Sequence, residues 1–242
     1  MWVNDQSVMI ARRSVSLSKT YTILGILMAI IGVGISGLGT TISNLGTLSN
    51  IPINGVNGLK PAIALTFVSI ALQVMAAILF STSVLLLYVY DKNNGVLEYF
   101  LSLGMTQGDV FRHYLKAALI LCSGIVGFEV VINLAVGLVE GTSGMMLLEV
   151  TGLVIVLALP VVSLETLIMM SFSSLQKQRV GSNQPLGMAI GVLMVMPTYI
   201  VGFAVPSLAV EIDLLTATII AVLTLTLYFF SSSLISREKL LP

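Results

Sequence analysis

The sequence predicts an all-α integral membrane protein with six transmembrane helices. Of its 242 residues, 57% are hydrophobic and only 9% are charged, whereas a soluble domain carries about 25% charged residues. The mean hydropathy of +1.05 indicates the same class. The long apolar runs are hydrophobic on every side and do not alternate, which argues against a transmembrane β-barrel.

Six apolar runs are long enough to cross a bilayer, which takes about 20 residues of α-helix. The predicted spans are residues 21–42, 62–90, 117–139, 147–172, 186–205 and 214–234. Residues 1–20 precede them as a cytoplasmic or interfacial amphipathic segment, residues 21–235 form one transmembrane domain, and residues 236–242 form a cytoplasmic tail. The loops leave no room for a second domain of about 50 residues, so chemistry that needs one must come from another chain.

The basic residues predict the orientation of these spans. Ten of the eleven Lys and Arg residues fall on one side of a six-span topology, and only Lys60 falls on the other. The positive-inside rule makes the basic side cytoplasmic, so both termini are expected there, in a multi-pass protein of the cell membrane. The formal net charge is zero, and no basic face for nucleic acid is expected.

The sequence carries no recognisable catalytic set. Ser36 lies in a Gly-x-Ser-Gly run, but the only histidine, His113, lies in a predicted cytoplasmic segment and cannot activate a serine at membrane depth. One histidine and one cysteine, Cys122, argue against a metal site. The P-loop pattern Gly-x-x-x-x-Gly-Lys-[Ser/Thr] is also absent from the sequence. We therefore expect a chain that is not an enzyme and holds no cofactor; any ATP, with its Mg²⁺, would bind a partner.

Two carboxyl groups fall within predicted spans, at Glu129 and Glu165. Ionisable groups in hydrocarbon are costly and usually face a bundle interior or a water-filled path. One interpretation is a substrate path or a proton relay. The other is a pair of polar groups satisfied by neighbours such as Asn133 or Ser163, and it is favoured because no span offers either glutamate a basic partner.

The loop between the second and third predicted spans contains a short helix. Asn93, Asn94 and Gly95 favour a turn, and residues 96–103 predict two helical turns that end at Gly104. This stretch is too apolar to be hidden in a short loop, so an exposed apolar patch is expected. The residues that cannot all be hidden are Leu97, Tyr99, Phe100 and Leu101.

The third long helix is predicted to begin just after that short helix. Thr106 and Asp109 have the spacing of a capping box, in which two side chains satisfy backbone N–H groups at a helix start. The helix would then continue into the third span.

Residues 94–116 resemble the corresponding loop of type-2 ABC exporter permeases. That family shows Gly-x-Leu-Glu followed by apolar positions and then a lysine before the third span, and the matching residues are Gly95, Leu97, Glu98, Phe100, Leu101 and Lys116. The family's proline after this segment is replaced around Gly104, and its arginine position falls at Gln107 or Gly108. The resemblance implies a coupling helix that docks into a groove of a separate ATPase subunit. The implied contact residues are Gly95, Val96, Leu97, Glu98, Tyr99, Phe100, Leu101 and Leu103.

Two further segments are similar to parts of the same family. Residues 7–19 resemble its interfacial connecting helix, with Arg12, Arg13 and Lys19 available for lipid phosphates or for the ATPase. A simple positive-inside anchor is the alternative interpretation of this segment. Residues 196–213 resemble the family's re-entrant outer segment.

The resemblance implies the permease subunit of an ATP-binding-cassette exporter. Two such subunits, identical or related, would form the path for a hydrophobic, lipid-like or peptide cargo, and separate ATPase subunits would drive it through residues 96–103. An alternative from another class is an ion-coupled secondary transporter or channel that uses Glu129 and Glu165. A third is an assembly or scaffold subunit, such as a haem-export component.

Overall fold

The described part of the chain is helical, as predicted. The computed structural model describes residues 6–44, 61–140, 144–171, 196, 200 and 209–234. Its helices are α1 (Gln6–Leu17), α2 (Lys19–Asn44), α3 (Pro61–Asn93), α4 (Val96–Ser102), α5 (Gln107–Glu140), α6 (Gly144–Ser171) and α9 (Ala209–Leu234). No strand occurs within these ranges, which confirms the all-α class.

Five helices are long and apolar enough to cross a membrane. The apolar segments are Lys19–Gly37, Val68–Asn93, Gln107–Val139, Val150–Ser171 and Glu211–Phe229. They coincide with five of the six predicted spans. The predicted span 186–205 lies outside the described residues except for Met196 and Ile200. The tail 236–242 and most of the predicted re-entrant segment also lie outside them, so the sixth span and the location of the termini stay predictions.

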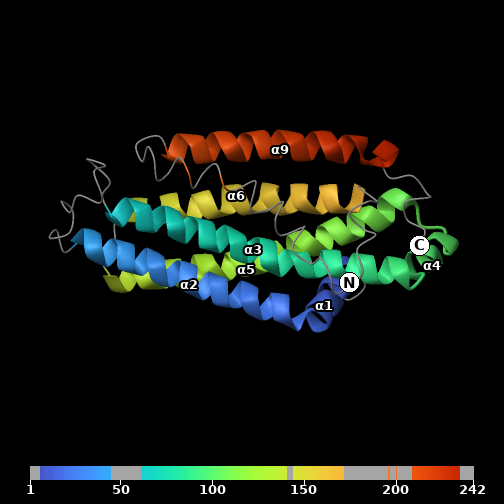
Figure 1. The fold of residues 1–242 in the computed structure, drawn as a ribbon, viewed down its shortest axis with the longest axis horizontal. Coiled ribbons are helices and arrows are strands. Elements are labelled where there is room, and N and C mark those ends of the chain that lie inside the picture. The colour runs from blue at the N-terminus through green and yellow to red at the C-terminus, as the bar shows by residue number, and fades with distance from the viewer. Residues whose placement is uncertain are drawn as a thin grey trace.

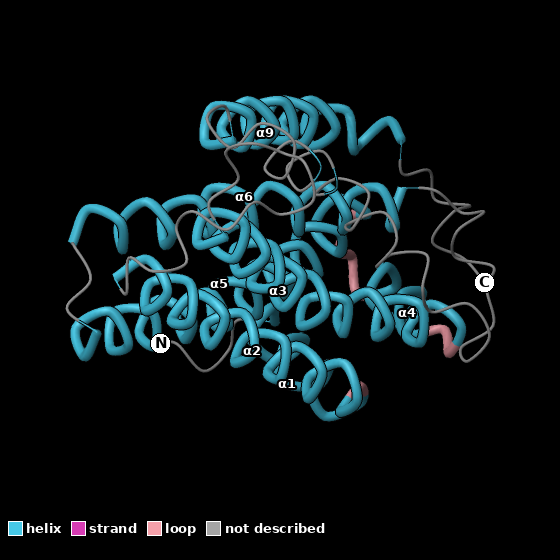
Figure 2. The backbone as a smooth tube through the Cα atoms, turned by 60° about the vertical axis from the view of Figure 1, so that its left-hand side comes forward, coloured by secondary structure: helices cyan, strands magenta, loops and turns pink. Residues whose placement is uncertain are grey.

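The five long helices lie side by side along the long axis of the molecule, with α1 and α4 at one end (Figure 1). This end, where α3 ends and α5 begins, is called the α1–α4 end below. Helix α3 is central and contacts α1, α2, α4, α5 and α6. Helix α9 packs on α6, on the side away from α1 and α2 (Figures 1 and 2).

The outer helices expose apolar faces, which is the arrangement that suits a lipid environment. Helix α3 is buried on nearly all sides along its second half, whereas α2, α5 and α9 each expose a row of large apolar side chains. Examples are Ile23, Leu27 and Ile30 on α2, Phe128, Val131 and Leu138 on α5, and Leu215, Val222 and Phe229 on α9. Lipid tails are as apolar as these side chains, so close packing must hold the bundle together.

Helices α2 and α3 approach each other through glycine. A Cβ added to Gly32 would lie 2.9 Å from Cγ and 3.2 Å from the backbone N of Gln73. One added to Gly25 would lie 3.2 Å from the carbonyl oxygen of Ala76. The two glycines therefore let the backbone of α2 lie directly against α3.

Polar side chains cross-link three helices within the apolar bundle. Gln73 on α3 donates from Nε2 to Ser69 Oγ at 2.9 Å and accepts at Oε1 from Asn133 Nδ2 on α5 at 2.8 Å. Ser36 on α2 lies 3.2 Å from Asn133 Oδ1. A buried amide without partners would be costly, so these contacts fix the register of α2, α3 and α5.

The close approach of α2 and α3 predicts a position-specific effect of one added side chain. We expect Gly32→Val to lower the free energy of unfolding by about 1–3 kcal/mol, because overpacking forces the helices apart. Gly34→Val is the matched control, since a Cβ at Gly34 would meet no atom within 4 Å. Unfolding of both variants in mixed micelles gives the comparison, and equal effects would show that helix propensity, not the contact, matters.

Candidate functional site

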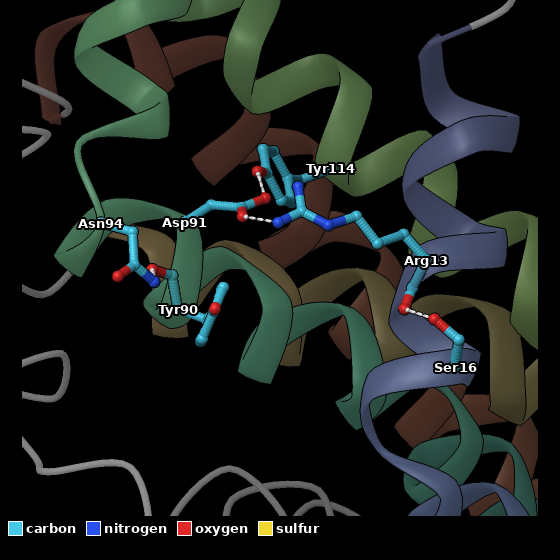
Figure 3. Close-up of polar contacts among 6 residues, drawn as sticks. All are labelled: Arg13, Ser16, Tyr90, Asp91, Asn94 and Tyr114. Carbon is cyan, nitrogen blue, oxygen red and sulfur yellow. Dashed lines mark hydrogen bonds and ion pairs between the residues drawn. The ribbon is translucent and has the colours of Figure 1, made fainter.

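A tight turn connects α3 to α4 at the α1–α4 end. Gly95 has φ +71°, a left-handed conformation that costs glycine little. Asn94 closes the end of α3, because its backbone N and its side-chain Nδ2 both donate to the carbonyl oxygen of Tyr90, at 3.1 and 2.8 Å (Figure 3). The predicted turn is therefore present, and only Asn94 and Gly95 connect the two helices.

Helix α4 ends in a Schellman motif, in which the last free carbonyls accept from residues beyond the helix. Gly104 has φ +86°. Its N donates to the Leu101 carbonyl at 3.1 Å, and Met105 N donates to the Phe100 carbonyl at 3.3 Å. The helix spans Val96–Ser102, one residue shorter than the prediction.

The predicted capping box at the start of α5 is confirmed. Asp109 N donates to Thr106 Oγ1 at 3.2 Å, and Thr106 N donates to Asp109 Oδ2 at 3.2 Å. The Thr106 hydroxyl also donates to Asp109 Oδ2 at 2.6 Å. Only three residues separate α4 from this cap, so both ends of α4 are joined tightly to long helices.

Helix α4 has one face toward the bundle and one face toward its surroundings. Leu97 is fully buried, and Phe100 and Leu101 are partly buried against the core. The exposed positions of α4 are Glu98, Ser102 and Tyr99, which is 60% exposed, and the C-cap residue Leu103 is 62% exposed.

Of the four residues that are not expected to be hidden together, Leu97 is the one that is fully buried. Side chains three and four residues apart share a helix face, so the face that carries Leu97, Phe100 and Leu101 packs inward while Tyr99 and Leu103 point away. The exposed apolar side chains here are Tyr99 on α4 and Leu103 at its C-cap, and Tyr90 before the turn is also exposed.

The end of α3, the Gly95 turn and α4 form a helical hairpin. An ion pair and a hydrogen bond hold the base of this hairpin from two sides (Figure 3). Asp91 on α3 is 1% exposed. Arg13 Nη2 on α1 lies 3.0 Å from its Oδ1, and Tyr114 on α5 donates to its Oδ2 at 2.6 Å. The Tyr114 ring also packs edge-on against Tyr88, with 5.3 Å between centroids. Three helices are thus joined at one carboxylate, four residues before Gly95.

Helix α1 lies against α3 and α5 on a face of small residues, formed by Ser7, Ala11, Ser14 and Ser18. Ser7 Oγ lies 3.1 Å from Nδ1 of His113 on α5. The three basic residues available for lipid phosphate or for the ATPase, Arg12, Arg13 and Lys19, are all exposed, and Arg13 also pairs with Asp91. His113 lies near the start of α5, 20 residues before Asn133, which Ser36 contacts; this is about 30 Å along the helix axis.

Glu129 and Glu165 are buried inside the bundle. Thr82 Oγ1 lies 3.3 Å from Glu165 Oε1. Among the described residues, both oxygens of Glu129 and Oε2 of Glu165 have no hydrogen-bond partner.

Asn133 and Ser163, the neighbours named for these carboxyl groups, have other partners, and the hydroxyl that contacts Glu165 belongs to Thr82. Asn133 is engaged with Gln73 and Ser36, and the Ser163 hydroxyl donates to the carbonyl oxygen of Leu159 at 2.7 Å. Backbone carbonyls of the same helix compete for serine hydroxyls, and the amide of Asn133 finds its partners on other helices.

The brace at Asp91 predicts that the hydroxyl of Tyr114 stabilises the α1–α4 end. We expect Tyr114→Phe to lower the free energy of unfolding by about 2 kcal/mol, because a buried carboxylate loses a hydrogen-bond donor. Tyr90→Phe, at an exposed tyrosine one residue from Asp91, should change it by less than about 0.5 kcal/mol. The same loss in both variants would mean that the Tyr114 hydroxyl contributes nothing specific.

Comparisons with known proteins identified no relative of this chain. No family model, curated protein or solved structure matches this chain. The resemblance carried by residues 94–116, together with the geometry above, therefore forms the basis of a proposal about function.

Proposed function

We propose that this chain is the permease subunit of an ATP-binding-cassette exporter, and that α4 is the coupling helix on which a separate ATPase subunit docks. The observation that carries the proposal is the outward pair Tyr99, on α4, and Leu103, at its C-cap, each about three-fifths exposed, while the opposite face of α4 packs on the core through Leu97. Large apolar side chains exposed together mark contacts with a partner. This pair lies within the stretch that resembles the family's coupling helix.

The joints around α4 suit a transmitting element. A loosely attached helix could be displaced by a partner without moving the long helices. Helix α4 is instead fixed to them by the Gly95 turn, the Schellman motif at Gly104 and the Thr106–Asp109 cap. The brace at Asp91 continues this connection into α1 and α5. A displacement of α4 would thus move the ends of α3 and α5 and the whole of α1.

The proposed assembly follows from two features of this chain, which are the absence of a P-loop pattern from the sequence and the exposed pair Tyr99 and Leu103. ATP and Mg²⁺ would bind the ATPase subunit, since the sequence has no P-loop, and this chain would not itself be an enzyme. A second permease subunit, identical or related, would complete the path for a hydrophobic, lipid-like or peptide cargo. Coupling requires two states of the paired bundles that ATP binding and cargo both bias. The α1–α4 end would face the cytoplasm of the cell, with Arg12 and Lys19 near lipid headgroups or the ATPase.

The outward pair predicts a selective loss of the partner. In Tyr99→Asp/Leu103→Asp, we expect the P-loop ATPase that co-purifies with the tagged chain from native membranes to bind more than about tenfold more weakly, because apolar anchors at an interface contribute most of the affinity. The measurements are identification of the ATPase by mass spectrometry and its ATP hydrolysis in the purified complex. Leu97 is unsuitable for this test, since a charge there would disrupt the core.

Val139→Asp is the matched control. Val139 is also apolar and exposed, but it lies at the opposite end of α5, so this variant should retain the ATPase. Equal retention of the ATPase by both variants would disprove docking at α4. Purification without any P-loop ATPase would disprove the exporter itself.

A further inference from the structure

Two carboxyl groups are enclosed in the middle of the bundle and take no part in the proposed docking of an ATPase. Glu129 on α5 is 0% exposed and Glu165 on α6 is 1% exposed. Both lie on helices that contact each other and α3. Neither is in the brace at Asp91 or in the hairpin that carries α4.

The hydrogen-bond geometry around these groups fits neutral carboxylic acids. Glu129 has no hydrogen-bond donor within reach among the residues that the structure describes. The hydroxyl of Thr82 lies 2.8 Å from the Ile78 carbonyl oxygen and 3.3 Å from Glu165 Oε1. A hydroxyl has one proton and two lone pairs. With that proton on the nearer Ile78 carbonyl, the Thr82 oxygen is left as an acceptor, which suits a protonated Glu165.

Within the described segments, no ion pair joins a basic side chain to either carboxyl group. The lysines and arginines of the described segments all lie near the α1–α4 end. They are Arg12, Arg13, Lys19, Lys92, Arg112 and Lys116. Lys116 precedes Glu129 by 13 residues on α5, which is about 20 Å along a helix axis. Thr82, opposite Glu165, precedes Lys92 by ten residues, which is about 15 Å.

The other ionisable groups around the pair add no positive charge. The thiol of Cys122 on α5 lies within electrostatic reach of both carboxyl groups. On α3, Asp91 is paired with Arg13 at the α1–α4 end. On α9, Asp213 lies in the first turns, near the opposite end. An ionised carboxylate in such surroundings costs several kcal/mol, and a proton removes that cost.

We propose that Glu129 and Glu165 form a proton-binding pair inside the membrane bundle, each holding a proton in this packing. A proton is the ligand that matches two carboxyl groups with no solvent contact. This inference is independent of the exporter proposal.

Infrared spectroscopy of the full chain in lipid vesicles tests the pair directly, because protonated and ionised carboxyl groups absorb separately. Carboxyl-¹³C glutamate distinguishes these groups from aspartate. At neutral pH we expect a protonated-glutamate absorption that falls by half in Glu129→Gln and in Glu165→Gln and disappears in the double variant. Glu211→Gln, at an exposed position on α9, is the matched control and should leave the absorption unchanged.

Three results would overturn the proton-binding pair. They are the absence of protonated glutamate from the labelled wild-type chain at neutral pH, survival of the absorption in the double variant, and its loss in Glu211→Gln. The wild-type spectrum decides the question even where a glutamine variant fails to insert. Co-purification of an ATPase is a separate measurement, so failure here leaves the docking proposal standing, and failure of docking leaves the pair standing.

Discussion

The buried carboxylate of Asp91 is the constraint on which the α1–α4 end depends. A carboxylate that is almost fully enclosed must be paired or neutralised, and here the partners come from two other helices, Arg13 on α1 and Tyr114 on α5. Because Asp91 lies in the last turn of α3, this pairing also fixes where the chain turns into α4. The position of the hairpin thus follows from an electrostatic requirement and not only from loop length.

Elsewhere the bundle is held by packing, as expected where apolar surface gains nothing by leaving lipid. Gly25 and Gly32 let α2 lie against α3, and the amides of Gln73 and Asn133 cross-link α2, α3 and α5. These amides are satisfied by neutral partners. Glu129 and Glu165 lie in the same interior without comparable partners among the described residues, and this contrast makes them the exceptions that call for a bound proton.

The two faces of α4 connect these features to a possible partner. Leu97 fills the space between α4 and the long helices, while Tyr99 and Leu103 remain outside. Helix α4 is held in place by a buried anchor and by a tight turn at each end. Its exposed apolar pair is available to bind a partner. Such an element would pass a movement of a bound subunit to α3, α5 and, through Arg13, to α1.

The sequence by itself determined the all-α class, five long apolar helices that the structure describes, the Gly95 turn, the short helix and the Thr106–Asp109 cap. These features depend on neighbouring residues, through apolar length, glycine conformation and local hydrogen bonds, so their signals are contiguous in the chain. Only the tertiary structure decided that Arg13 pairs with Asp91, that Leu97 faces inward, and that Asn133 and Ser163 have partners other than Glu129 and Glu165. Those outcomes depend on which helix faces are brought together across separations such as 78 residues between Arg13 and Asp91. The helical period of the sequence shows which side chains share a face of a helix, but it does not show which other helix that face contacts.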